Sequence, residues 1–182
     1  MSKFTLHNQD SAAPEAQPLL ENSLKNFGMI PNLHAVMAES PALLEGYQVL
    51  HSLAQKSSLN KEELTVVWQA INVEHACHYC VPAHTAIANM MQVDEDIVEA
   101  LRNETPLKSE KLEVLRNTTL SMLRQRGVID ETILDTFYQA GYSRQNLLDI
   151  VLVMSQKVMS NYVNHLADTP VDEPFKAFAW SK

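Results

Sequence analysis

Cysteine is scarce in this sequence, which contains only Cys77 and Cys80. A chain of 182 residues with two cysteines three positions apart is not a disulfide scaffold, in which several bridges replace a large core. In a reducing compartment, an isolated Cys-x-x-Cys pair indicates redox or metal chemistry instead. The two cysteines are therefore the first candidates for a functional site.

Glycine is also scarce, with four residues, and few stretches alternate polar and apolar side chains. Apolar residues recur mainly at helical spacing, so the sequence predicts an all-α fold. A chain of 182 residues, 46% of them hydrophobic, is long enough to bury the core of one domain. We expect an extended N-terminal arm over residues 1–22 and a single helical domain over residues 23–182.

An excess of basic charge and long apolar runs are missing too. The formal net charge is -8, so the chain lacks the basic patch that phosphate backbones need, and we expect no nucleic-acid partner. No apolar run approaches the roughly 18 residues of a membrane span. The first 22 residues do not begin with a basic segment followed by an apolar stretch, as a secretory signal would. These absences predict a cytoplasmic protein with no membrane partner.

Proline, glycine and capping residues predict the helix boundaries. Pro41 suits the first turn of one helix, Asn60 suits the N-cap of the next, and Gly127 and Gly141 follow the ends of two later helices. A shift of 81 positions superimposes similar apolar spacing, which is compatible with two similar helical halves. The expected helices span residues 32–39, 41–55, 61–75, 77–91, 94–102, 109–126, 130–140 and 144–167, and we expect the aromatic tail 172–182 to pack on the body or on a neighbouring subunit.

The segment from Cys77 to His84 is the part of the sequence that predicts chemistry. If a helix begins at Cys77, then Cys77 and Cys80 are an i,i+3 pair on one face, and His84 follows one turn later. A thiol near a helix N-terminus has a lowered pKa because the helix dipole and the free backbone N–H groups favour the thiolate. A neighbouring histidine can remove or return a proton. One thiolate can attack a peroxide or disulfide, and the second thiol can resolve the product.

Two other interpretations of the cysteine pair remain open. Cys77, Cys80 and His84, together with His75 or His78, could hold zinc. Structural zinc sites usually draw their ligands from two separated pairs, however, and the sequence has no second pair. The two thiols could also be inert and buried, since free cysteine often acts as a small apolar side chain.

The stretch from Asn72 to Ala86 resembles the AhpD-like branch of the carboxymuconolactone decarboxylase family, the alkylhydroperoxidases. Flanking segments also look like the peroxidase-related members of that branch, so the resemblance covers residues 25–180; these segments are 28–32, 40–41, 162–165 and 175–180. The resemblance implies an all-α fold that assembles as trimers or hexamers. It also implies thiol-dependent reduction of a hydroperoxide, with a dithiol protein as the electron donor.

The resemblance assigns a role to each residue of the pair. It implies that Cys80 is the peroxidatic thiol, Cys77 the resolving thiol and His84 the proton relay. No flavin, haem or nucleotide motif is visible, so the cysteine pair would be the only redox centre and no cofactor is expected.

A carboxylate of the family pattern is missing from this chain. The family commonly has a glutamate twelve residues before the first cysteine, and Thr65 stands there. Glu63 lies close by on the same predicted helix and Glu74 lies nearer the thiols, so the relay uses Glu63, Glu74 or no carboxylate. The competing hypotheses are a metal-binding or non-catalytic oligomer and a lactone decarboxylase, whose branch shares the fold and generally lacks the cysteine pair.

Overall fold

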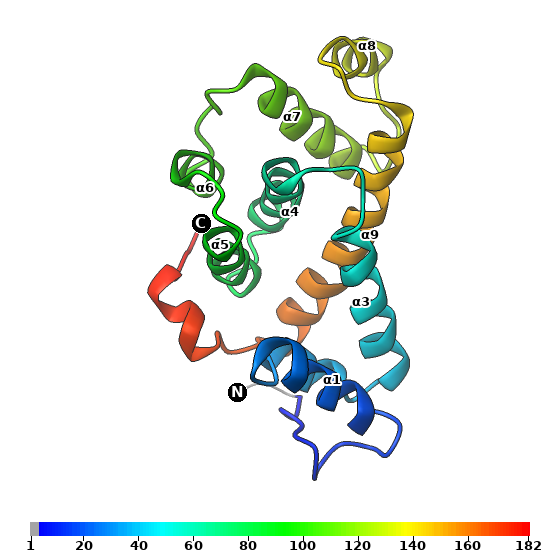
Figure 1. Ribbon diagram of the computed structural model, residues 1–182, viewed down its shortest axis with the longest axis vertical. Coiled ribbons are helices and arrows are strands. Elements are labelled where there is room, and N and C mark those ends of the chain that lie inside the picture. The colour runs from blue at the N-terminus through cyan, green and yellow to red at the C-terminus, as the bar shows by residue number, and fades with distance from the viewer. Residues whose placement is uncertain (1–3) are drawn as a thin grey trace.

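The computed structural model describes residues 4–182, and every regular element in that range is a helix (Figure 1). The elements are α1 Gln17–Phe27, α2 Asn32–Met37, α3 Pro41–Ala54, α4 Lys61–Glu74, α5 Cys80–Met90, α6 Glu95–Arg102, α7 Glu110–Arg124, α8 Glu131–Gln139, α9 Arg144–Ala167 and the 3-10 helix η1 Glu173–Phe178. The prediction of an all-α fold is confirmed. None of the helices in this range has the length and apolarity that a membrane crossing requires.

Helix α4 lies at the centre of the molecule and contacts α5, α6, α7 and α9 (Figure 1). It begins with a capping box, in which Asn60 and Glu63 each bind the backbone N–H of the other. Every residue from Glu63 to Val73 is buried. This burial explains why the sequence of α4 is apolar on nearly all sides.

Helix α9 is the longest element and runs beside α3 and α4 (Figure 1). Its first half supplies Ile150 and Val153 to an apolar core that also contains Trp68 and Phe137. Its second half passes a separate apolar cluster, which contains Tyr47, Cys77, Cys80 and side chains of α1, α2 and α3. The two clusters place the cysteine pair where α4, α5 and α9 meet.

The expected extended arm over residues 1–22 is wrong from residue 17 onwards, because helix α1 begins there. Leu20 and Ser23 are buried on one face of α1, and Gly28, with φ 71°, ends the helix in the left-handed conformation. The polar composition of this segment hid a short apolar face that forms a helix only against α2 and α3. Residues 1–3 of the expected arm lie outside the described residues.

The C-terminal tail packs on the body of the protein, which is one of the two arrangements that the sequence allowed. The indole N–H of Trp180 donates to the Arg102 carbonyl at 2.9 Å, and the Arg102 guanidinium donates to the Phe178 carbonyl at 3.1 Å. Tyr79, inside the cysteine motif, donates a short hydrogen bond to Asp172. The tail therefore lies beside α5 and α6 and is joined to the motif (Figure 1).

Candidate active site

The end of α4 determines where the cysteine pair lies. The N–H of Ala76 donates to the Val73 carbonyl at 2.9 Å, and the N–H of Cys77 donates to the Asn72 carbonyl at 3.0 Å. Ala76 has φ 50°, so these bonds form a Schellman motif with alanine in the left-handed position that usually holds glycine. The motif reverses the chain and places Cys77 directly against the last turn of α4.

Cys77 directly precedes α5, whose start falls within the range of residues 77–80 expected from the sequence. Helix α5 begins at Cys80, and the Cys77 sulfur accepts a hydrogen bond from the Cys80 N–H at 3.3 Å. Cys77 thus satisfies one of the free N–H groups at the start of α5, as a capping side chain does. Both thiols are free and buried. The two sulfurs are still brought together, because capping and i,i+3 spacing both turn Cys77 back toward Cys80.

Two side chains of α9 contact the Cys80 sulfur. The Asn164 amide donates to the Cys80 sulfur at 3.1 Å, and the Ser160 hydroxyl lies 3.8 Å from that sulfur. Burial by itself would raise the pKa of Cys80, but the hydrogen bond from the Cys77 thiol, the charge of Lys157 and the contacts with Asn164 and Ser160 outweigh it. The net effect lowers the pKa of Cys80 to about 5. Cys80 is therefore the thiolate of the pair at neutral pH.

Cys77 has the opposite character. Its thiol donates a hydrogen bond to Cys80, it is buried, and it lies next to the negative charge of Cys80, and all three effects raise its pKa far above the ordinary value. At neutral pH the pair therefore holds one thiolate and one thiol. This asymmetry agrees with a nucleophile at Cys80 and a proton-bearing resolving group at Cys77.

His84 and Lys157 form the second pair of the site. The Lys157 ammonium lies 2.7 Å from His84 Nε2, and both side chains are buried. Burial lowers the pKa of His84 well below its ordinary value, and the charges of Lys157 and His51 lower it further. Burial also lowers the pKa of Lys157, while the negative charges of Cys80 and Cys77 raise it. Within residues 4–182 no carboxylate pairs with Lys157. The Cys80 thiolate is therefore the anion that compensates the positive charge of Lys157.

Two polar atoms at the site have no hydrogen-bond partner among the described residues. These atoms are His84 Nδ1 and Asn164 Oδ1, both buried. His84 does not hydrogen-bond to either sulfur in the described structure; its ring packs against Trp68 with 4.7 Å between the centroids. Buried polar atoms normally have partners, so these two are free to bind a substrate or a water molecule.

Glu74 does not lie with the thiols. It forms a bidentate ion pair with Arg124 of α7, and the two N–O distances are 2.7 and 2.6 Å. The hydrogen bonds from Arg124 lower the pKa of Glu74, which keeps it ionised and paired. The structure therefore gives Glu74 no contact through which it could relay a proton to Cys80.

Glu63 lies at the opposite end of α4 from the thiols. It completes the capping box with Asn60 and contacts the Lys111 ammonium at 3.1 Å. Eleven positions separate Glu63 from Glu74, the last residue of α4, and at about 1.5 Å per helical residue this places Glu63 roughly 16 Å from the end of α4 where Cys77 lies. Thr65, where the family pattern has glutamate, donates its hydroxyl to the Lys61 carbonyl. Of the five predicted site residues, the structure brings together Cys77, Cys80 and His84.

The histidines proposed as additional zinc ligands are engaged elsewhere. His75 Nδ1 lies 2.8 Å from Asn161 Oδ1, and His78 Nε2 lies 3.0 Å from the Thr169 carbonyl. In the part of the chain that the structure describes, no three histidine, cysteine or acidic side chains converge as metal ligands. The cysteine pair therefore has hydrogen-bonding partners around it rather than an assembled zinc ligand set.

Buried amides hold α4, α5 and α9 in this arrangement. Asn161 of α9 donates to Asn72 of α4 at 3.0 Å, and Asn72 donates to Gln69 Oε1 at 3.0 Å. Gln69 donates to the Val81 carbonyl of α5 at 3.1 Å. A buried hydrogen-bond network of this kind fixes the positions of its members, because every broken bond leaves an unpaired buried polar group.

Sequence reasoning missed Lys157, Ser160 and Asn164. Their spacing of three and four residues puts them on one face of α9, next to Gln156 and Asn161. A usable signal was present, since a helix with apolar flanks carries this polar face through its middle. The pattern could not show whether the polar face met solvent or a thiol.

No family model matches the sequence, and none of the curated proteins matches it. Solved structures do match. A peroxidase-related protein from Ralstonia eutropha JMP134, described as an alkylhydroperoxidase AhpD core, superimposes with a TM-score of 0.84 at 15% identity, over 96% of this chain and 94% of that chain. This chain has the AhpD-like fold. The resemblance seen in the sequence is thereby supported at the level of the fold.

Two further structures have the same AhpD-like fold. A peroxidase-related protein from Silicibacter sp. TM1040 gives a TM-score of 0.78 at 22% identity, over 95% of this chain and 94% of that chain. A variant of the debrominase Bmp8 in complex with 2,3,4-tribromopyrrole gives a TM-score of 0.77 at 17% identity, over 97% of both chains. Identities this low establish the AhpD-like fold and leave the reaction to be argued from the site.

Proposed function

We propose that this protein is a thiol-dependent hydroperoxide reductase. The observation that carries the proposal is the environment of Cys80, whose sulfur accepts the Asn164 amide at 3.1 Å and lies in the field of a buried lysine that has no carboxylate partner among the described residues. A stabilised thiolate next to a protonated thiol is what two-electron reduction of a peroxide requires.

In the first step the Cys80 thiolate attacks one oxygen of the peroxide. The O–O bond breaks, a sulfenic acid forms on Cys80, and the other oxygen leaves as an alcohol once it receives a proton. Lys157, hydrogen-bonded to His84, is the cationic proton donor of the site. In this proposal the Lys157–His84 pair takes the place of the relay carboxylate that the sequence lacks.

In the second step Cys77 resolves the sulfenic acid. Its thiol gives up a proton, its sulfur attacks Cys80, and water leaves as the disulfide forms. A dithiol protein then reduces the disulfide, so one hydroperoxide and one dithiol become one alcohol, one water and one disulfide. The short connection that caps α5 with Cys77 allows the two sulfurs to bond without a change in the positions of α4 and α9.

A thiol titration with intact-mass measurement tests the proposal. One equivalent of tert-butyl hydroperoxide should remove both free thiols and lower the mass by two hydrogen atoms. Cys80→Ser should abolish hydroperoxide consumption, and Cys77→Ser should leave a sulfenic acid on Cys80 that dimedone traps. Two thiols still free after prolonged exposure would refute the proposal, and full activity of the double serine variant on a lactone would favour the decarboxylase.

A second electrophile is favoured by the structural likeness to the debrominase. In that reaction the Cys80 thiolate would take bromine from carbon, the carbon would take a proton, and Cys77 would displace bromide to form the same disulfide. Bromide release from 2,3,4-tribromopyrrole in the presence of dithiothreitol tests this. Release by the wild type and not by Cys80→Ser supports debromination, and no release from either protein refutes it.

A further inference from the structure

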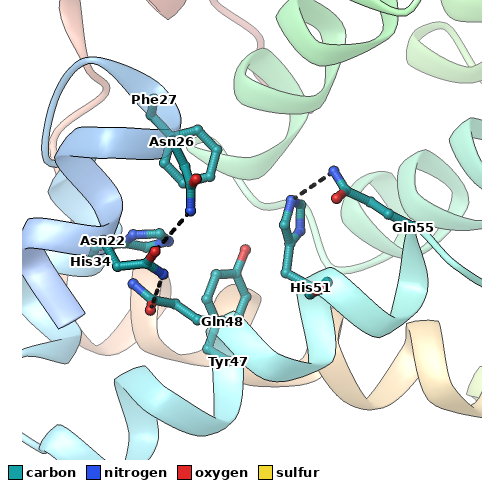
Figure 2. Close-up of a pocket in the computed structure, with 9 residues that line it drawn as sticks. Asn22, Asn26, Phe27, His34, Tyr47, Gln48, His51 and Gln55 are labelled. Atoms are coloured by element: carbon teal, nitrogen blue, oxygen red, sulfur yellow. Dashed lines mark hydrogen bonds between the residues drawn. The ribbon is translucent and has the colours of Figure 1, made fainter.

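A cavity of about 530 Å³ opens between α1 and α3 (Figure 2). Asn22, Asn26 and Phe27 of α1 face Tyr47 and His51 of α3 across it. Hydrogen bonds link the amides of its wall, since Asn22 donates to Gln48 at 3.0 Å and Asn26 donates to Asn22 at 3.1 Å. The volume suits a small organic molecule.

The lining of this cavity is uncharged. Among the described residues that line it there is no aspartate, glutamate, lysine or arginine. Burial lowers the pKa of His34 to about 3, and burial together with the charge of Lys157 lowers the pKa of His51 to about 4, so both rings are neutral at physiological pH. Amides supply hydrogen bonds, and Phe27, 45% exposed, offers an aromatic face. The cavity therefore suits a neutral molecule with a flat apolar part and gives a carboxylate or phosphate no cation.

One layer of side chains separates the cavity from the thiols. Gln156 of α9 donates to the Tyr47 hydroxyl at 3.1 Å and lies 3.2 Å from His51 Nδ1, so it contacts both residues that close the inner end of the cavity. Ser160, one turn further along α9, lies against the Cys80 sulfur. Tyr47 itself belongs to the same apolar cluster as Cys77 and Cys80. The negative charge of Cys80 also contributes to the raised pKa of Tyr47, after burial.

A peroxide can reach Cys80 only if a side chain moves, because the Cys80 residue is 2% exposed. Among the described residues, Tyr47 is the one apolar side chain that both lines the cavity and belongs to the cysteine cluster. Its ring is held between His34, at 5.5 Å between centroids, and His51, at 6.2 Å. Rotation of a single tyrosine side chain requires no movement of a helix.

We infer that the cavity between α1 and α3 is the route by which substrate reaches Cys80, that it selects uncharged organic hydroperoxides with an aromatic or similarly flat group, and that Tyr47 separates it from the thiol. This inference rests on the proposed function for the identity of the substrate. The route itself concerns access to Cys80 and holds for any neutral reagent that reacts with the thiolate.

Two tryptophan substitutions at the cavity wall test the route. Ser52→Trp and Asn26→Trp place a large side chain in the cavity from α3 and α1, and both positions are exposed, so the fold tolerates them. Their matched controls are Leu53→Trp and Lys25→Trp, at exposed neighbouring positions outside the lining. With dithiothreitol as reductant, the cavity variants should lower kcat/KM for cumene hydroperoxide about tenfold. The control variants should match the wild type.

The preference of the cavity for uncharged substrates is tested by comparing a neutral hydroperoxide with a charged one. Wild-type protein should reduce cumene hydroperoxide with a kcat/KM about tenfold or more above that of the same molecule carrying a ring carboxylate. Equal values for the two substrates, or cavity variants indistinguishable from their controls, would overturn the inference.

The rate of thiol modification tests access to Cys80 independently of hydroperoxide reduction. The rate of thiol loss to methyl methanethiosulfonate, a neutral reagent, should fall in Ser52→Trp and Asn26→Trp and not in the controls. If the wild type reduces no hydroperoxide, the proposed function fails and this measurement alone decides the route. Slower modification in the cavity variants would then support the route, and equal rates in all five proteins would overturn it.

Discussion

At the scale of single residues, the most unusual feature of this site is a buried lysine beside the cysteine pair. Lys157 contacts His84 at 2.7 Å and is fully buried. A lone buried cation is unfavourable unless an anion compensates it. The Cys80 thiolate provides that charge, so the lysine and the thiolate stabilise each other.

Replacing Lys157 should therefore change both the pKa of Cys80 and the stability of the protein. Lys157→Met removes the charge, keeps much of the volume, and should raise the pKa of Cys80 by about one unit or more. Alkylation of the wild type by iodoacetamide should stay fast as the pH falls toward about 5, where Cys80 titrates, while the rate in the variant should fall at a higher pH. Unfolding by urea at pH 7 should show a loss of stability, because the buried Cys80 thiolate is left without its cation. An unchanged pH profile would contradict the role of Lys157, and Lys56→Met at an exposed position is the control.

Glu74 gives the opposite expectation. Because its carboxylate binds Arg124 and contacts neither thiol, Glu74→Gln should leave the rate of hydroperoxide reduction within about twofold of the wild type. The half-exposed ion pair contributes about 1 kcal/mol or less to stability, so the melting temperature should change little. If the rate of hydroperoxide reduction fell by orders of magnitude, Glu74 would have to act as the proton relay.

At the scale of elements, the turn between α4 and α5 determines the position of the cysteines. Ala76 holds the left-handed conformation that the Schellman motif requires, and a residue with a Cβ atom is strained there by about 1–2 kcal/mol. The neighbouring hydrogen bonds of Cys77 and the buried amides of α4 and α9 hold the turn in place. Strain of this kind is common where a backbone positions functional side chains.

Ala76→Gly should relieve this strain. Glycine adopts φ 50° without a Cβ clash, so the free energy of unfolding should rise by about 0.5–1 kcal/mol after its greater flexibility in the unfolded chain is counted. Urea denaturation of the two proteins measures the difference. Ala88→Gly, in the interior of α5, should instead lower stability, and two destabilised variants would contradict the assignment of strain to residue 76.

At the scale of the whole molecule, stability should depend on the neutral state of buried histidines. His34 and His51 have pKa values lowered to about 3 and about 4, against about 6.5 in an unfolded chain. Below pH 6.5 these histidines bind protons in the unfolded state but stay neutral in the folded state. The free energy of unfolding therefore falls as the pH drops from about 6.5 to about 4. Each such histidine contributes at most about 1.4 kcal/mol per pH unit.

Urea denaturation at several pH values checks this dependence. His34→Gln should make the loss of stability at acid pH less steep, because glutamine does not titrate and one fewer proton is bound on unfolding. His165→Gln, at an exposed position, should leave the slope unchanged. A wild-type stability that does not change between pH 7 and pH 5 would contradict the burial of neutral histidines.

The outer surface of α9 is where we would look first for the contact of the expected homo-oligomer, which stays a prediction. Leu148, Val151, Tyr162 and Leu166 are all exposed on this one helix, with Leu148 at 69% and Leu166 at 72%. Apolar side chains gathered on a helix surface are typical of contacts between subunits. Light scattering should show a trimer or hexamer, and Leu148→Lys with Leu166→Lys should lower its mass. A wild-type monomer at all concentrations would refute the prediction.

The sequence by itself determined that the chain is helical, where most of its helices begin and end, and that His84 follows Cys80 by one turn of the same helix. These features depend on interactions between residues close in the chain: helical periodicity, caps such as Asn60, and the spacing of the cysteine motif. The helix α1 was missed because its short apolar face becomes stable only when α2 and α3 cover it.

Only the tertiary structure decided what surrounds the thiols. Lys157, Ser160 and Asn164 lie some eighty residues from Cys80 in the chain, and their role depends on how α9 crosses α5. The packing of α4 against α7 likewise pairs Glu74 with Arg124 and Glu63 with Lys111. Local propensity fixes the elements, but packing between distant elements fixes the electrostatic environment, and the pKa of Cys80 depends on that environment.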